Sequence, residues 1–260
     1  MKEITAIMTG YNRPYTLKKQ YDAIKNQTVA PVDILLWHNK GTAPESPPYS
    51  DLITDNSAQL SFNNFLVDGV KGAFCNHNFK FHGRFAFALL AQTEYVAIFD
   101  DDTIPGEKWF ENCLNTMDNR EGILGTTGIK LQGDFYDPHI KVGFNAFQSG
   151  KQPNYIAEEV DLVGHCWFVK REWLQYMWYE YPVCWDNGED IQFSYLCQKY
   201  GGIKTFVPPH PANHKELWGS IEPNIGQDKK ASWRKTNHMP LRNMIVQECI
   251  KNGWKPVFKK

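Results

Sequence analysis

The sequence contains no Cys-x-x-Cys pair, although it has six cysteines: Cys75, Cys113, Cys166, Cys184, Cys197 and Cys249. Without such a pair, neither a zinc ribbon nor a thioredoxin-like redox site is indicated. Several of the cysteines lie in apolar stretches, where a free thiol packs as a small hydrophobic group. We therefore expect free cysteines and a reducing, cytosolic environment.

Long apolar runs and an excess of one charge are missing as well. No stretch approaches the roughly 20 apolar residues of a transmembrane helix. The N-terminal apolar run is too short and too interrupted for a signal peptide. The formal net charge is -1, so no global field attracts nucleic acid or an anionic membrane. We expect a cytoplasmic protein with no integral membrane segment and no nucleic-acid partner.

What the chain does contain is an alternation of strand and helix patterns. Apolar runs at 4–8, 32–37 and 95–99 predict strands. Helical spacing of apolar residues at 17–24 and 109–117 predicts helices between and after them. There is no internal repeat and no low-complexity linker, so the 260 residues are expected to form one domain. The sequence thus predicts an α/β fold with a mostly parallel sheet flanked by helices.

The second half of the chain is less regular. Apolar runs at 160–169 and 203–207 predict two further strands. A helix is expected to open at 186–190 and to end at Gly201 and Gly202, because glycine is typical of a helix C-terminus. The proline-rich stretch 42–49 is expected to form a loop. The tail from about residue 221 is polar and predicts no definite element.

Polar residues follow three of the predicted strands: Thr9–Arg13, Asn39 and Asp100–Asp102. Ligands bind beyond the carboxyl ends of the strands in such sheets, so these residues are expected to converge on one cleft. Three adjacent aspartates repel one another, and a divalent cation would neutralise them. The alternative is a solvated acidic turn in which Asp102 caps the next helix. The apolar strand before the triplet favours the metal site.

A second acidic cluster, Asn187-Gly188-Glu189-Asp190, leaves two interpretations open. Carboxylates in the first turn of a helix are stabilised by the helix dipole, which would be a purely structural role. Alternatively, one carboxylate accepts the proton of an acceptor hydroxyl. Histidines allow the same two interpretations. His210 and His214 follow a strand end, and His165 with Trp167 lies on a strand that faces the cleft or the core.

The ordered motifs resemble those of glycosyltransferases with the GT-A fold. The segment Phe99-Asp100-Asp101-Asp102 resembles their Asp-x-Asp motif. Residues 9–13 resemble the nucleotide-binding segment of family 2 and of the exostosin-like family 64, and residues 187–191 resemble the Glu-Asp segment of both. With residues 164–167 and 208–211, the order also resembles the N-terminal glycosyltransferase domain of a multidomain chlorella-virus protein.

The resemblance implies a nucleotide-binding half (1–102), an acceptor-binding half (103–220) and a C-terminal tail (221–260). It implies Mn²⁺ or Mg²⁺ as cofactor, with Asp102 and Asp100 as ligands and His210 or His214 as further candidates. Residues implied to contact the donor are Thr9, Tyr11, Arg13, Asn39, Arg84, Asp100 and Asp101. Asp190, with Glu189 beside it, would be the base of an inverting reaction, although family 64 enzymes retain configuration. His165 and Trp167 would form the acceptor face.

The expected reaction moves a hexosyl or deoxyhexosyl group from a UDP-, GDP- or dTDP-linked sugar to a hydroxyl of a glycan or another acceptor. Two alternatives remain at this stage. A nucleotidyltransferase acting on sugar phosphates would usually show a glycine-rich phosphate loop near the N-terminus, where this chain has only Gly10. A non-catalytic carbohydrate-binding protein would need neither the Asp triplet nor the Glu189-Asp190 pair.

Overall fold

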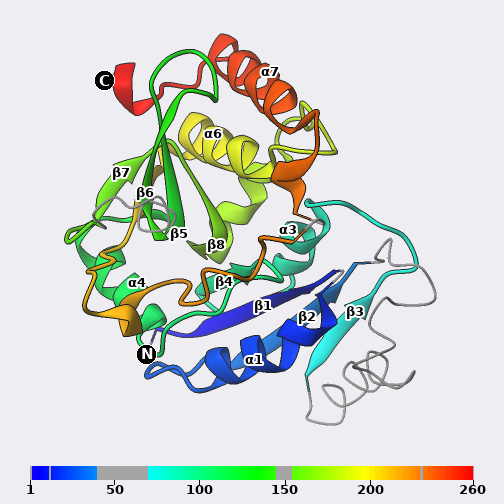
Figure 1. The fold of residues 1–260 in the computed structure, drawn as a ribbon, viewed down its shortest axis with the longest axis vertical. Coiled ribbons are helices and arrows are strands. Elements are labelled where there is room, and N and C mark those ends of the chain that lie inside the picture. The colour runs from blue at the N-terminus through cyan, green and yellow to red at the C-terminus, as the bar shows by residue number, and fades with distance from the viewer. Residues whose placement is uncertain (1, 12, 40–69, 145–153, 229–230, 260) are drawn as a thin grey trace.

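The computed structural model describes residues 2–11, 13–39, 70–144, 154–228 and 231–259, so Asn12 and the expected loop 42–49 lie outside the described residues. The described strands form one nine-stranded sheet in the order β3-β2-β1-β4-β8-β5-β9-β7, and β6 pairs with β5 (Figure 1). The strands are β1 (Ile4–Gly10), β2 (Asp33–His38), β3 (Lys71–Phe74), β4 (Tyr95–Phe99), β5 (Gly122–Leu131), β6 (His139–Gly143), β7 (Glu158–Val160), β8 (Leu162–Lys170) and β9 (Lys204–Val207).

The N-terminal half of the sheet is parallel. β1 pairs in parallel with β2 and β4, and β2 pairs in parallel with β3. Every residue of β1 and β4 is buried, as continuous apolar strands covered on both faces should be. Helices α1 (Pro14–Lys25) and α3 (Gly83–Ala88) lie on opposite sides of these strands (Figure 1). The predicted strand–helix alternation is therefore confirmed here.

The other half of the sheet is mixed. β8 runs antiparallel to both β4 and β5, whereas β5 and β9 are parallel. β6 and β7 pair antiparallel with β5 and β9. Parallel pairing is thus continuous only as far as β4 and recurs between β5 and β9, within a mixed sheet. The β4–β8 pairing sets Phe99 opposite Cys166, which brings the residue before Cys166 next to the Asp triplet.

The strand predicted over 160–169 is divided by Asp161. Its buried carboxylate accepts hydrogen bonds from the backbone N–H groups of Leu131, at 2.7 Å, and Val257, at 2.6 Å. β7 therefore ends at Val160 and β8 begins at Leu162, each paired with a different strand. The apolar pattern could not reveal this break, because residues on both sides of Asp161 are buried.

The remaining helices are α4 (Trp109–Asn119), α6 (Glu189–Gly201) and α7 (His238–Lys251), with a 3-10 helix, η1 (Arg171–Trp178), before α6. Gly202 caps α6 in a left-handed conformation, with φ of 63°, as the glycine pair predicted. The tail contains a buried helix: α7 packs outside α6 (Figure 1) and buries Ile245, Val246 and Cys249. Because the tail is polar in composition, the sequence did not predict this second cluster of buried apolar residues.

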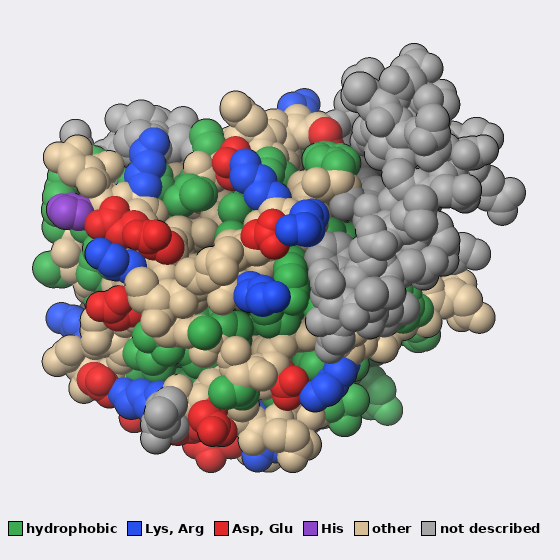
Figure 2. All heavy atoms as spheres, turned by 90° about the horizontal axis from the view of Figure 1, so that it is seen from below, with side chains coloured by type: hydrophobic (Ala, Val, Ile, Leu, Met, Phe, Trp, Pro, Cys, Tyr) green, Lys and Arg blue, Asp and Glu red, His purple; other side chains and the backbone are tan. Residues whose placement is uncertain are grey.

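The free cysteines and the mixture of charges on the surface are those expected from the sequence. All six cysteines are free, and four of them are buried. On the face seen from below in Figure 1, acidic and basic side chains are interspersed (Figure 2). One such pair is Lys18–Asp22 on α1. Of the helices in the described part of the chain, none is long and apolar enough to cross a membrane.

Candidate functional site

The Asp triplet forms a turn directly after the buried strand β4, and two neighbouring elements hold this turn in place. The Asp100 N–H and the Thr103 hydroxyl both donate to the His165 carbonyl of β8, at 2.9 Å each. From α1, the Gln20 side chain donates to the carbonyls of Asp100 and Thr103, at 2.7 Å each. The Thr16 hydroxyl donates to the Asp101 carbonyl at 2.7 Å. The backbone that carries the three carboxylates is thus fixed from both sides.

The three carboxylates have different partners. Asp100 forms an ion pair with Arg84, and Asp101 pairs with Arg13 at 2.5 Å. Burial, with Asp102 adding to it, raises the pKa of Asp101 to about 7. Burial alone would also raise the pKa of Asp102, but His165 and Arg13 lower it overall. Asp102, which faces His165, is therefore the carboxylate of the triplet whose pKa is lowered, whereas burial raises the pKa of Asp100 and Asp101.

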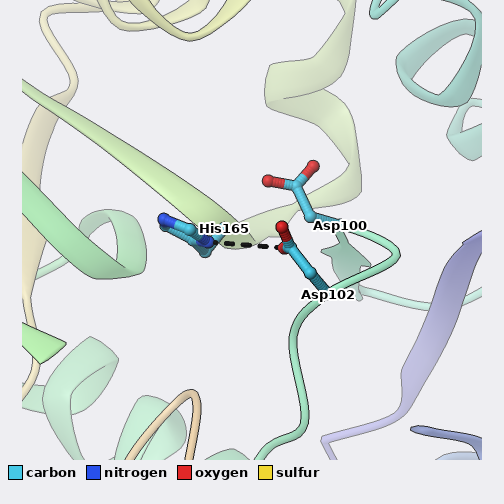
Figure 3. A group of neighbouring side chains, drawn as sticks. All are labelled: Asp100, Asp102 and His165. Carbon is cyan, nitrogen blue, oxygen red and sulfur yellow. Dashed lines mark ion pairs between the residues drawn. The ribbon is translucent and has the colours of Figure 1, made fainter. Parts of the chain in front are cut away.

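Asp100, Asp102 and His165 form a group that fits a divalent cation. One ligand atom from each residue lies within 4.8 Å of the other two (Figure 3). His165 Nδ1 and Asp102 Oδ1 are 3.5 Å apart, which is longer than an ordinary N–H···O hydrogen bond. Ligand atoms at adjacent positions around one ion with bonds of about 2.1 Å are about 3 Å apart. The spacing and the O, O, N donor set therefore suit Mn²⁺ or Mg²⁺.

His165 reaches this position through an unusual backbone conformation. Its φ is 65°, in the left-handed region that residues other than glycine rarely adopt. β5, beside it, has a register irregularity between Gly125 and Thr127. The positive φ and the irregular pairing bend β8 at His165. The His165 carbonyl there accepts hydrogen bonds from the Asp turn, and its ring lies beside Asp102. The family resemblance implied that His165 lies on the acceptor face. The apolar pattern of the strand that contains His165 does not indicate such a bend.

The second acidic cluster opens α6. Gly188, with φ of 79°, precedes the helix, and Glu189 and Asp190 form its first turn. Asp190 pairs with Arg242 of α7 through both carboxylate oxygens, at 2.7 and 3.0 Å. Burial, with Asp190 adding to it, raises the pKa of Glu189 to about 7. Both carboxylates are buried, and each pairs with an arginine, Glu189 with Arg84 and Asp190 with Arg242. Such pairing offsets the cost of burying a charged group.

Arg84 joins the two acidic clusters. One end of its guanidinium contacts Asp100, and the other donates to Glu189 at 3.0 Å. Its charge lies 4.7 Å from the centre of the Trp167 ring, a cation–π contact. Trp167 itself is 1% exposed and packs edge-on against Phe85. The structure therefore places Trp167 beneath Arg84 as support, with little surface left for a ligand.

Most residues named from the sequence line one cavity of about 880 Å³. From the predicted set, the cavity is lined by Thr9, Tyr11, Arg13, Asn39, Arg84, Asp100, Asp101, Asp102, His165, Trp167, Glu189 and Asp190. The Asn39 side chain also fastens the segment after β3, since its amide donates to Asn78 at 2.7 Å and its oxygen accepts from the Phe79 N–H at 2.8 Å. The convergence of strand ends on one cleft is as expected. The individual roles stay predictions.

His210 and His214 are not brought to this cavity. His210 is fully buried: Nδ1 donates to the Pro208 carbonyl at 2.8 Å, and Nε2 accepts from the Gly219 N–H at 3.3 Å. Burial lowers its pKa to about 4. His214 is exposed and lies 3.0 Å from Glu216. In the described part of the chain, His165 occupies the position beside the aspartates that the sequence analysis offered to these two.

Three residues of the C-terminal tail that contact the site residues were not predicted from the sequence. Asp228 pairs with Arg13 at 2.8 Å. Gly226, with φ of 82°, lies so close to Asp102 that an added Cβ would be 2.2 Å from its Oδ2. Arg242 holds Asp190, as described above. The available signal was the spacing of Arg242, Ile245, Val246 and Cys249, which is the i, i+3, i+4, i+7 pattern of a buried helix face.

Comparison with known proteins identifies the family. The family described as Glycosyl transferase family 2 matches residues 5–178. The fold is similar to that of S. aureus TarS, with a TM-score of 0.53, 14% identity and coverage of 81% of this chain and 36% of that chain. It is also similar to GalNAc-T7 crystallised with UDP, GalNAc and Mn²⁺, with a TM-score of 0.57, 12% identity and coverage of 80% and 42%.

The chain therefore spans well under half the length of each of these two structures. Among curated protein sequences, the comparison finds no match. The two structural likenesses, at 14% and 12% identity, show the fold, which is of the GT-A type predicted from the sequence. The family match covers more than half of the chain and includes the Asp triplet and His165. This chain belongs to glycosyl transferase family 2.

Proposed function

We propose that the cavity binds a nucleoside-diphosphate sugar together with Mn²⁺ or Mg²⁺ and transfers the sugar to a hydroxyl of a glycan or another acceptor, with inversion. The observation that carries this proposal is the meeting of two acidic clusters in one cavity. One is the Asp100–Asp102–His165 group, and the other is the Glu189–Asp190 pair. A donor site needs the first, and deprotonation of an acceptor needs the second.

The charge balance supports a divalent cation. The two clusters contribute five carboxylates, but only three arginines pair with them, and one of these, Arg13, is shared with Asp228, so the carboxylates outnumber their cationic partners and leave an excess of negative charge. A single divalent ion held by Asp100, Asp102 and His165 would offset this excess. When bound, the ion would stabilise the departing diphosphate as a Lewis acid. Arg13 and Arg84, already at the aspartates, would lie beside the same diphosphate.

Asp190 is the proposed general base. Arg242 contacts both of its carboxylate oxygens, and the Ile191 N–H donates to Oδ1 at 2.9 Å. These bonds fix the orientation of the carboxylate, and in the proposed reaction it accepts the proton of an acceptor hydroxyl. Glu189 is turned to Arg84 instead, and we assign it to holding that arginine.

The division of the chain into halves is kept with one change. Residues 1–102 are proposed to bind the donor and 103–220 to form most of the acceptor side. Residues 221–260 join the acceptor side, because Arg242 reaches Asp190 from there. Thr9, Tyr11 and Asn39 are proposed to contact the nucleoside. Since GalNAc-T7 was crystallised with UDP and Mn²⁺, these are the first ligands to test.

The test is calorimetric titration with UDP, GDP and dTDP, each with and without Mn²⁺. We expect one nucleotide to bind at least about tenfold more tightly with Mn²⁺. Asp102→Asn should abolish this gain, whereas Asp118→Asn, at an exposed site, should keep it. Equal affinity with and without Mn²⁺ in the native protein would refute the metal assignment. Pyrophosphate release from a nucleoside triphosphate and a sugar phosphate would instead reveal a nucleotidyltransferase.

The base is tested once a donor and an acceptor are known. Asp190→Asn keeps the shape and one acceptor oxygen for Arg242, but it accepts a proton poorly. We expect kcat to fall by roughly a hundredfold while nucleotide affinity is unchanged. Asp186→Asn, at an exposed neighbour paired with Lys80, is the control. Near-normal turnover would exclude Asp190 as base, and a product with the donor's anomeric configuration would exclude inversion.

A further inference from the structure

A basic wall stands on the side of the cavity away from the Asp triplet. It consists of His139 and Lys141 of β6, of Lys235, which precedes α7, and of His238, the first residue of α7, arranged around Arg242. We propose that this wall binds an anionic group, a phosphate or a carboxylate, on the acceptor glycan. The proposal rests on the proposed function, because it names the substrate class that the transfer would use.

The wall is continuous from β6 to α7. The Arg242 guanidinium lies 4.1 Å from the centre of the Tyr136 ring, and that ring lies 4.7 Å from the ring of His139. On the other side, His238 lies close enough to Arg242, Lys235 and Asp190 to interact electrostatically with all three. The proposed base therefore faces a band of donors and cations. An acceptor hydroxyl at Asp190 would bring its neighbouring substituents against this band.

The two lysines provide the unbalanced charge of the wall. Arg242 is already neutralised by Asp190. Lys141 and Lys235 are exposed, line the cavity, and form no ion pair with any residue that the structure describes. By contrast, the third lysine of the cavity, Lys80, pairs with Asp186 at 3.1 Å. Two unpaired ammonium groups on one cavity wall create a local positive potential that favours an anionic ligand.

The register of the sheet separates Lys141 from the donor side. Lys141 is opposite Ile129 of β5, and Ile129 is opposite Leu162 of β8. Neighbouring strands are about 4.8 Å apart, so β6 lies about 10 Å from β8. Leu162 is itself three residues along β8 from His165, which is a further distance of about 10 Å. The diphosphate of a donor would lie at the ion beside His165, so the wall is left for the acceptor.

The same region offers surface for a sugar ring. Trp233, which lies two residues before Lys235 and lines the cavity, is 49% exposed. Aromatic faces cover the apolar C–H faces of sugars. One face of this indole carries the Arg234 guanidinium, 4.3 Å from the ring centre, so a cation already accompanies the aromatic surface. Pairing an aromatic face with a cation fits a phosphorylated sugar or a uronic acid better than a neutral sugar.

The test measures binding of three simple sugars: glucose 6-phosphate, glucuronate and glucose. Saturation-transfer NMR is recorded on the full chain with Mn²⁺ and UDP present. We expect at least one anionic sugar to bind about tenfold more tightly than glucose. The variant Lys141→Met/Lys235→Met keeps the apolar stems and should lose this preference. The control Lys18→Met/Lys71→Met removes two exposed charges elsewhere and should keep it.

Each result decides the proposal. Preference for glucose 6-phosphate identifies phosphate as the anion, and preference for glucuronate identifies carboxylate. Equal binding of all three sugars, or a preference that survives in the double variant, overturns the basic wall. Mn²⁺–UDP binding is measured separately, so its failure would count against the proposed function alone.

Discussion

At the scale of single residues, His165 combines a strained backbone with a ring beside Asp102. A left-handed conformation costs a residue with a Cβ about 1–2 kcal/mol, and such strain persists where the surrounding structure fixes it. Here the His165 carbonyl receives two hydrogen bonds from the Asp turn. The turn and the imidazole are thus held by the same bend, which explains how a strand residue can face the metal group.

Two substitutions separate the backbone effect from the ring. Both His165→Ala and His165→Gly remove the imidazole, but only glycine relieves the positive φ. We expect the glycine variant to be more stable than the alanine variant by about 1 kcal/mol in urea denaturation. Both should bind Mn²⁺ more weakly than the native protein, as measured by calorimetry. Equal stability of the two variants would show that the bend carries no strain, and unchanged Mn²⁺ affinity would remove His165 from the ligand set.

At the scale of elements, the start of α6 decides where both carboxylates of the second cluster lie. Gly188 caps the helix with φ of 79°, and an added Cβ would meet Ile245 of α7 at 2.5 Å. The cap therefore has two requirements, a left-handed backbone and close packing between the helices. A side chain at this position would push α7 away and carry Arg242 away from Asp190.

Gly188→Ala is expected to destabilise the protein by more than the matched variant Gly202→Ala at the other end of α6. Gly202 also has a positive φ, of 63°, but nothing lies within 4 Å of its added Cβ, so its variant should lose only about 1 kcal/mol. Gly188→Ala should lose at least about 1 kcal/mol more through overpacking. Urea denaturation measures both. Similar losses at the two glycines would contradict the proposed contact between the helices.

The elements also show what the sequence can predict. The strands β1 and β4 are buried along their whole length, so their mainly apolar sequences predicted them, and the Asp triplet that follows β4 could be identified as a candidate site. α7 was missed although its buried residues have helical spacing, because the buried face is narrow and includes the charged Arg242. The position of His165 depends on a bend in β8, which the local sequence does not encode. Long-range pairing, such as Arg242 with Asp190, comes only from the tertiary structure.

At the scale of the whole molecule, three neutral histidines link stability to pH. The pKa of His82, His210 and His238 is lowered to about 4. Burial is the main cause for all three, and Arg84 adds to it for His82 and Arg242 for His238. A histidine in the unfolded chain titrates near about 6.5. Between these values the unfolded chain binds protons that the folded chain does not. The contribution of these three histidines to the free energy of unfolding therefore falls as the pH falls from about 6.5 to about 4, and they contribute no slope above that window. Asp101 and Glu189, whose pKa is raised to about 7, contribute a slope of the opposite sign.

His210 offers the cleanest test, because its side chain is 0% exposed. Its contribution to the slope reaches about 1.4 kcal/mol per pH unit. His210→Asn keeps a donor for the Pro208 carbonyl but cannot titrate, so urea denaturation at pH 7.5, 6.0 and 5.0 should give a flatter dependence. The exposed His214→Asn serves as control and should leave the slope as in the native protein. An unchanged slope in the His210 variant would contradict this prediction.

The contact of Arg84 with both Asp100 and Glu189 has an evolutionary consequence. The family match ends at residue 178, before α6, α7 and the part of the basic wall that Lys235 and His238 supply, whereas His139 and Lys141 lie within it. The proposed donor residues thus lie on the matched stretch of chain, while Asp190 and the Lys235–His238 part of the wall lie on another. Arg84 connects the two stretches, because it pairs with Asp100 on the first and requires only one carboxylate, that of Glu189, from the second. Exchange of residues 179–260 between relatives that keep this carboxylate would be a route by which an old donor site acquires a new acceptor.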